Sequence, residues 1–177
     1  MRRTRFLVFI LCLLGSSAVC AADLSPQQAA ASKFVQQFYN WYTPLALKES
    51  KTPSSDVAIS KRGAAFDPAL LRALKEDAEA QRKVSDDIVG LDFDPFLDSQ
   101  DPDDKYTVGD VTESAGVFLV SVYGSRKGKR EAKASVVAEL KPAKDSFVFT
   151  NFRYGADGDL LAILKQLADD RAHPSTD

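Results

Sequence analysis

The chain has almost no cysteine or histidine, and this shortage limits the chemistry available to it. Its two cysteines, Cys12 and Cys20, lie in the first 22 residues, and its one histidine, His173, lies four residues from the end. With no imidazole or thiol in the body of the chain, Ser-His-Asp and Cys-His nucleophilic sites are excluded. Zinc sites built from His and Cys are excluded as well. An enzyme of this sequence would have to use Asp, Glu, Lys or Tyr.

Long apolar runs are also scarce, and the clearest one lies at the N-terminus. Arg2, Arg3 and Arg5 precede an apolar run over residues 6–14, and small residues follow as far as Ala22. This pattern is typical of a bacterial export signal. The run is about half of the ~20 residues that a membrane-spanning helix needs, so the sequence predicts no permanent transmembrane helix.

Processing of this signal defines the expected mature protein. Cleavage would leave a start at Ala22 or Asp23 and a protein in the periplasm. Lipid attachment at Cys20 is the less favoured alternative, because the lipidation pathway prefers a small residue where this chain has Val19. We therefore divide the chain into a signal peptide (1–22), a single domain (23–172) and a flexible tail (173–177).

Positive charge is not in excess. The chain has 23 basic and 25 acidic residues, so loss of the three arginines of the signal leaves 20 against 25, a net charge of −5. This balance makes nucleic acid a poor partner. About 155 residues remain without any cysteine, so the domain must depend on burial of apolar side chains rather than on disulfides.

An aromatic helix is expected at the start of the domain. Ser25-Pro26-Gln27-Gln28 is a capping-box sequence with proline in the first turn. Apolar residues then recur at helical spacing until the helix ends near Pro44; they are Phe34, Val35, Phe38, Trp41, Tyr42 and Leu45. We interpret this stripe as a core face. The alternative is that Trp41 and Tyr42 line a ligand pocket.

A loop and a second helix follow. Residues 48–62 are polar and rich in turn formers, which predicts a loop or partly ordered excursion. Asp67 before Pro68 is a natural N-cap, and Leu70, Leu71 and Leu74 form the apolar face of the helix. The mixed charges over residues 75–83 predict a solvated helix surface.

The second half of the chain changes to a strand pattern. Strands are expected over 105–111, 117–123, 131–140 and 146–154, with turns at 124–130 and 141–145 and a last helix from about 158 to 170. Asp157 or Asp159 can cap that helix. Successive strands joined by short turns pair as an antiparallel meander. The order predicts an α+β fold with helices packed on a curved antiparallel sheet and a closing C-terminal helix.

The strand over 117–123 is apolar on both faces. Val117 and Leu119 lie on one face, and Phe118, Val120 and Val122 lie on the other. The helices can cover one face, so a second layer, a cavity or a partner protein must cover the other. A closed core and a binding surface explain this pattern equally well.

Three parts of the sequence carry a family resemblance: residues 34–42, residues 91–101, and residues 147–149 with 152–154 and 160–164. Together they resemble a family of small exported bacterial proteins that carries a domain of unknown function and includes YbjP-like envelope lipoproteins. The most specific piece is Asp94-Pro95-Phe96-Leu97 with Gln100-Asp101. Phe147 stands where the family often has tryptophan. The resemblance covers roughly residues 30–168 and implies a cone-like, nuclear transport factor two-like fold in the cell envelope, without an established activity.

Aspartates crowd the segment from 92 to 110, at positions 92, 94, 98, 101, 103, 104 and 110. Calcium binds clusters of carboxylate and carbonyl oxygens. The glycine that a calcium loop needs is missing from the spacing, so we favour a structural loop and predict no metal site. Asp94, Phe96 and Asp101 are the candidate binding residues, because the resemblance runs through them. They could also pin the loop that precedes the sheet.

The turn before the third expected strand is basic. Arg126, Lys127, Lys129 and Arg130 occupy four of five consecutive positions. Such a cluster can contact anionic lipid headgroups or an acidic partner. It can also simply keep a hairpin soluble and unpaired.

From these observations we expect an exported cell-envelope protein that is not an enzyme and binds another protein through its sheet face or a sheet-edge groove, without a cofactor. One alternative is a periplasmic immunity protein that neutralises a secreted toxin. The other is a small-molecule-binding protein or an isomerase or dehydratase of the same fold, in which an apolar pocket raises the pKa of an Asp or Glu base. Glu131, Lys133 and Glu139 are expected to point outward, which disfavours the enzyme.

Overall fold

The computed structural model describes residues 24–84, 86–155 and 158–173. The predicted export signal, its cleavage site, Cys20 and the tail beyond His173 lie outside the described residues. None of the described helices is both long and apolar enough to cross a membrane.

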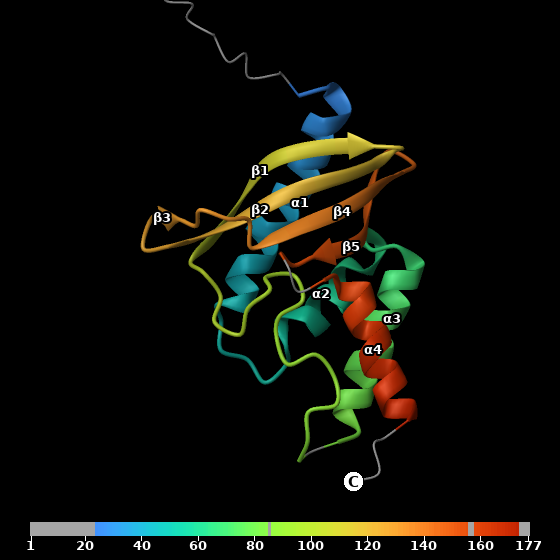
Figure 1. Ribbon diagram of the computed structural model, residues 1–177. Helices are drawn as coiled ribbons and strands as arrows, with labels where there is room; N and C mark the ends of the chain where they lie inside the picture. The colour runs from blue at the N-terminus through green and yellow to red at the C-terminus, as the bar shows by residue number, and fades with distance from the viewer. Residues whose placement is uncertain (1–23, 85, 156–157, 174–177) are drawn as a thin grey trace, which may run out of the picture.

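The described chain forms an α+β fold (Figure 1). The helices are α1 (Pro26–Ala46), α2 (Ser54–Arg62), the short 3-10 helix η1 (Gly63–Ala65), α3 (Pro68–Arg82) and α4 (Leu160–Ala172). The strands are β1 (Lys105–Ser114), β2 (Val117–Arg126), β3 (Lys129–Arg130), β4 (Val136–Ala143) and β5 (Ser146–Arg153). The predicted fold class, a curved antiparallel sheet with helices packed on it and a helix at the end, is confirmed, and the sheet is not closed.

The sheet is the expected meander, with order β1-β2-β4-β5 and β3 beside the end of β2. Two-residue turns join β1 to β2, β2 to β3 and β4 to β5; in the first, Ala115 and Gly116 have φ values of 51° and 73°. Positive φ at both central positions matches the right-handed twist of the strands. The expected turn over 124–130 is too long, because β2 runs on to Arg126 and turns tightly at Lys127 and Gly128.

The expected strand over 131–140 starts too early. It begins at Val136, because Glu131 and Ser135 bond to the far end of β2 through backbone amides and form an irregular connection. The predicted alternation is correct where the strand exists: Val136, Ala138 and Leu140 are buried.

Helix α1 lies against one face of the sheet, and α3 and α4 pack side by side near the end of β5 (Figure 1). The capping box of α1 is formed, with Gln28 N donating to Ser25 Oγ at 3.2 Å and Ser25 N donating to Gln28 Oε1 at 2.9 Å. The helix continues to Ala46 rather than ending at Pro44. A proline in the last turn removes only its own amide hydrogen bond, which the buried aromatic face outweighs.

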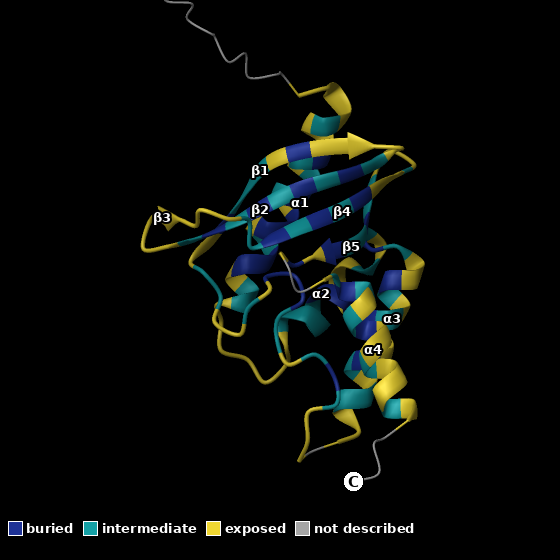
Figure 2. Cartoon of the chain, viewed as in Figure 1, coloured by how far each residue is buried: buried dark blue, intermediate teal, exposed yellow. Residues whose placement is uncertain are grey.

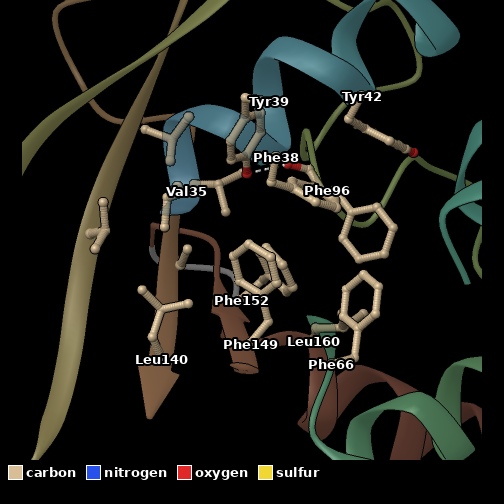
Figure 3. Packing of buried hydrophobic residues seen from close by; sticks show 14 of the residues in the cluster. Val35, Phe38, Tyr39, Tyr42, Phe66, Phe96, Leu140, Phe149, Phe152 and Leu160 are labelled. Carbon is tan, nitrogen blue, oxygen red and sulfur yellow. Dashed lines mark hydrogen bonds between the residues drawn. The ribbon is translucent and has the colours of Figure 1, made fainter. Parts of the chain in front are cut away.

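The core is aromatic and centred on Phe38 (Figure 3). Its ring lies 4.9 Å from Phe149, 5.3 Å from Tyr42 and 5.5 Å from Phe96, measured between ring centres. Edge-to-face and stacked pairs of this kind add to the free energy gained by burial. The interpretation of the helical stripe as a core face therefore holds for its most buried members.

The structure answers which face of β2 is covered. Phe118, Val120 and Val122 are buried, whereas Val117 and Leu119 are only partly buried. Figure 2 shows no helix in front of β1, β2 and β4 on that second face. One layer of helices therefore covers one face of the sheet, and no helix of the described residues covers the other face.

Side chains and loops protect both edges of the sheet. On β1, Gln36 Oε1 accepts from Val108 N at 2.9 Å, and Gln36 Nε2 donates to Tyr106 O at 3.2 Å. On β5, Asp67 N donates to Phe149 O at 2.8 Å. These contacts satisfy backbone groups that would otherwise be open to pairing with another chain.

One sequence prediction about the helices is wrong, and another holds except at one residue. Residues 54–62 of the predicted loop form α2, which has only Ala58 and Ile59 buried, too few to give a recognisable apolar period. The charged run of α3 is solvated except at Asp77, which is only 4% exposed. Asp77 is buried because an arginine from α4 pairs with it.

Candidate functional site

Three tyrosines hold the turn formed by Asp94-Pro95-Phe96-Leu97. Tyr39 donates its hydroxyl hydrogen to Phe96 O at 2.6 Å, as Figure 3 shows, and Tyr154 donates to Pro95 O at 2.7 Å. Both hydroxyls are buried, so each of these bonds replaces contact with water. Burial raises the pKa of Tyr39 and of Tyr154 well above the ordinary value. The tyrosines therefore act as neutral donors.

Asp94 is the centre of the same turn. Its Oδ2 accepts from Tyr42 Oη at 2.6 Å and from Ser54 Oγ at 2.8 Å, and its Oδ1 accepts from Phe96 N at 3.0 Å. Burial raises the pKa of Asp94 above its ordinary value, and these hydrogen bonds oppose that rise without cancelling it. The carboxyl group ties α1, α2 and the turn together.

Beside this cluster lies an open groove of about 950 Å3, which we call the α2–α3 groove. It runs between α2, α3 and the segment 88–102. Ile59, Leu74 and Leu91 form its apolar floor, and Asp94 lies at its base. At the rim, Ile88 is 68% exposed, the most exposed of the large apolar side chains in the described part of the chain. An exposed isoleucine beside an apolar floor is typical of a contact surface.

Most carboxylates of the groove are already paired. Asp56 Oδ2 lies 3.2 Å from Arg82 Nη1. Asp77 Oδ1 lies 2.7 Å from Arg171 Nη1, and its Oδ2 accepts from Leu91 N at 2.9 Å. The exposed Asp92 accepts only from Gln100, through its backbone oxygen at 2.9 Å and its carboxylate at 3.5 Å, among the hydrogen bonds found. Asp92 is therefore the carboxylate of the groove most available to a ligand.

The loop that forms the rim is anchored by polar side chains. Gln81 Oε1 accepts from Val89 N at 2.9 Å and from Gly90 N at 3.0 Å, and Arg171 Nη1 donates to Val89 O at 2.6 Å. Gly90 has no room for a side chain, because a Cβ would lie 2.9 Å from Asp77 Oδ2. The rim is thus held at its base, and Ile88 remains exposed above it.

The structure does not bring Asp94 and Asp101 into one ligand set. Asp101 Oδ2 lies 2.6 Å from Arg126 Nη1 at the β2–β3 hairpin, whereas Asp94 belongs to the tyrosine cluster. Among the described residues, no three His, Cys, Asp or Glu side chains converge closely enough to hold a metal ion. The acidic segment is used to fasten loops, as the structural interpretation of it expects. Phe96 is fully buried in the core.

The basic residues of the hairpin are not one free patch. Arg126 Nε lies 2.9 Å from Asp103 Oδ1 in addition to its bond with Asp101. Hydrogen bonds to these two carboxylates raise the pKa of Arg126 further. The backbone amide of Lys127 donates to Asp104 Oδ2 at 2.6 Å. Acidic and basic segments that are far apart in the sequence thus partly neutralise each other.

The remaining predicted site residues are spread over three places. Arg130 lies over the Tyr123 ring, with its Cζ 3.7 Å from the ring centre, and Lys129 is exposed. Trp41 is partly buried beneath Arg62, with 4.9 Å between the guanidinium carbon and the ring centre. Tyr42 is buried, and neither Trp41 nor Tyr42 lines the α2–α3 groove.

Sequence reasoning missed Tyr39, Tyr154 and Ser54. The two tyrosines lay within the segments 34–42 and 152–154 but were given no role of their own, and Ser54 lay in a predicted loop. A weak signal was present, because a tyrosine that is buried usually needs a hydrogen-bond partner for its hydroxyl. Their acceptors could not be identified from sequence, since they lie 57 and 59 residues away along the chain.

No family model, no curated protein and no solved structure matches this chain in the comparisons made. The family resemblance of the sequence therefore stays a prediction.

Proposed function

We propose that this protein is a non-catalytic binding module of the cell envelope that takes a peptide segment of a partner protein in its α2–α3 groove. The observation that carries the proposal is the combination of an apolar floor, an exposed Ile88 at the rim and carboxylates that are mostly engaged already. A surface of this kind can bury apolar side chains of a partner without performing chemistry on them.

The charges of the groove define the chemistry of the peptide. Asp92 is exposed on one wall, Asp94 lies at the base, and Asp56 forms an ion pair with Arg82. Lys51 is the only basic residue of the lining without a carboxylate partner in the described chain. An excess of carboxylate favours a segment in which a lysine or arginine follows an apolar residue. The apolar side chain would pack on the partly exposed Leu91 and on Ile88, and the cation would face Asp92.

The buried Asp94 is the group that an enzyme of this fold would use as a base, since its pKa is raised. Both of its oxygens accept hydrogen bonds from the protein itself, from Tyr42, Ser54 and the Phe96 amide. A base needs a free acceptor position within reach of the substrate proton. The contacts of Asp94 therefore support a positioning role and favour binding over catalysis.

The predicted export signal implies that the protein meets its partner in the cell envelope. An envelope protein is the partner we propose, and a toxin delivered by neighbouring cells is the alternative that the sequence leaves open. Both would engage the groove through a peptide segment, so one experiment on the groove tests the shared claim.

The test is a selection of displayed random peptides on the isolated domain, followed by affinity measurement on variants. Selected peptides should pair a basic residue with an apolar one. Ile88→Glu and Asp92→Asn should each weaken binding by about tenfold or more, because each removes a central contact. Leu24→Glu is the matched control, since Leu24 is 46% exposed and lies at the start of α1, outside the groove. Failure to select any peptide, or equal binding by the Ile88→Glu protein, would refute the proposal.

A further inference from the structure

A second and smaller pocket shares no lining residue with the α2–α3 groove. It has a volume of about 310 Å3 and is lined by Phe34, Gln37, Phe38, Arg62 and Ala65. We call it the α1–α2 pocket. Phe34 and Phe38 are one turn apart on α1, so their rings form its floor. Arg62 is the last residue of α2 and forms its wall.

Arg62 has no acidic partner in the described chain. The ion pairs found there involve Arg82, Lys83, Arg126, Arg153 and Arg171. The contact found for Arg62 is with the Trp41 ring, 4.9 Å from its guanidinium carbon to the ring centre. Stacking on an aromatic ring restrains the guanidinium plane and leaves its N–H groups free to donate.

The surroundings of Arg62 identify a class of ligand. A guanidinium binds a carboxylate through two parallel N–H···O bonds. The rings of Phe34 and Phe38 next to it can bury an aromatic or short aliphatic group, and the exposed Gln37 can donate from its amide to a carboxylate oxygen. The volume is at the low end of small-molecule sites and too small for a folded partner.

The geometry points to the α1–α2 pocket as a binding site for a small organic acid that carries an aromatic or short apolar tail. The carboxylate would pair with Arg62, and the tail would lie against Phe34 and Phe38. This site is separate from the α2–α3 groove and does not depend on the function proposed for that groove.

The chain contains its own reporter for this site. Trp41 is the only tryptophan in the sequence, and it lies directly under Arg62. A carboxylate that binds the guanidinium should change the tryptophan fluorescence in a saturable way. Phenylacetate is the probe. Acetate lacks the apolar tail and 2-phenylethylamine reverses the charge, so both should leave the fluorescence nearly unchanged at the same concentrations.

Variants separate this site from general charge attraction. Arg62→Gln should weaken phenylacetate binding by about tenfold or more, because it removes a charge-assisted pair. Gln37→Glu adds a carboxylate beside the pocket at an exposed helix position and should weaken binding several-fold without loss of folding. Lys61→Gln is the matched control, since Lys61 precedes Arg62, is exposed and does not line the pocket. Because the Arg62→Gln substitution itself changes the surroundings of Trp41 and hence its fluorescence, phenylacetate binding by this variant is also measured by calorimetry.

Several outcomes would overturn the assignment: no saturable response to phenylacetate, equal binding of 2-phenylethylamine, or an equal loss in Lys61→Gln. The Ile88→Glu variant distinguishes the two proposals, because it should lose peptide binding and still bind phenylacetate. Loss of both ligands in that variant would show that the pocket is not independent of the groove.

Discussion

Replacement of Asp94 by alanine tests how the turn at residues 94–97 is held. The carboxyl group accepts from Tyr42 Oη, Ser54 Oγ and Phe96 N, at 2.6, 2.8 and 3.0 Å. After substitution the two hydroxyls can still bond to each other, since Tyr42 Oη and Ser54 Oγ are 3.1 Å apart. The amide of the fully buried Phe96 then has no acceptor, and one hydroxyl hydrogen loses its partner.

The expected loss of stability follows from these contacts. A buried donor left without an acceptor costs about 1–3 kcal/mol, so two such donors give about 2–6 kcal/mol. Burial raises the pKa of Asp94, which means that burying its charged form is unfavourable. Removal of the carboxyl group therefore offsets part of this loss of stability. We therefore expect Asp94→Ala to lower the free energy of unfolding by about 3 kcal/mol, a large part of the 5–15 kcal/mol typical of a domain.

Urea unfolding of the isolated domain, followed by far-UV circular dichroism, measures this loss. Tyr42→Phe should cost about 1 kcal/mol, and the double variant should cost less than the sum of the two, because both remove the same bond. Asp169→Ala is the control, at an exposed position on α4, with an expected change within about 0.5 kcal/mol. A loss for Asp94→Ala no larger than that of the control would refute the role assigned to this carboxyl group.

Three further predictions concern pH, the buried ion pair and the sheet edge. Because the pKa of Asp94 is raised in the folded state, its contribution to folding stability is most favourable below the unfolded value of 3.8 and is lost as pH rises through the folded pKa. The stability of the wild-type protein relative to Asp94→Asn should therefore fall over that pH range. A rise in relative stability would contradict the assignment. Asp77→Ala leaves the partly buried Arg171 without its carboxylate partner and the Leu91 amide without its acceptor, and it should cost about 3 kcal/mol in urea unfolding. An unchanged midpoint would show that the pair is dispensable. Gln36→Ala should cost about 1 kcal/mol and speed amide exchange at Val108, and unchanged exchange would show that Gln36 does not protect the edge of β1.

The fold could be predicted from sequence where local signals and period agree. The capping box at Ser25 and the N-cap at Asp67 place the starts of α1 and α3 correctly, and Asp159 caps α4 by accepting from Ala162 N at 3.0 Å. Each signal acts within four residues, so it needs no knowledge of the rest of the chain. Helix α2 was not predicted because its stability comes from contacts with other elements rather than from its own apolar pattern.

The candidate site could be predicted only in part. Asp94 and Tyr42 were singled out, but for different reasons, and the hydrogen bond that joins them spans 52 residues of sequence. Ser54 was assigned to a loop and was not considered. The α2–α3 groove required the positions of α2, α3 and the segment 88–102 relative to one another, and no local pattern contains that information.

By itself, the sequence determined the class of fold, the meander and the buried face of β4, because alternation along a strand decides which side chains share a face. It also determined that residues 24–172 contain neither His nor Cys. Only the tertiary structure decided which aspartates are buried and paired, which arginines lack a carboxylate partner, and where the open surfaces lie. Those properties depend on contacts between residues far apart in the chain. Burial of a charged side chain costs free energy, and a partner at hydrogen-bond distance offsets that cost.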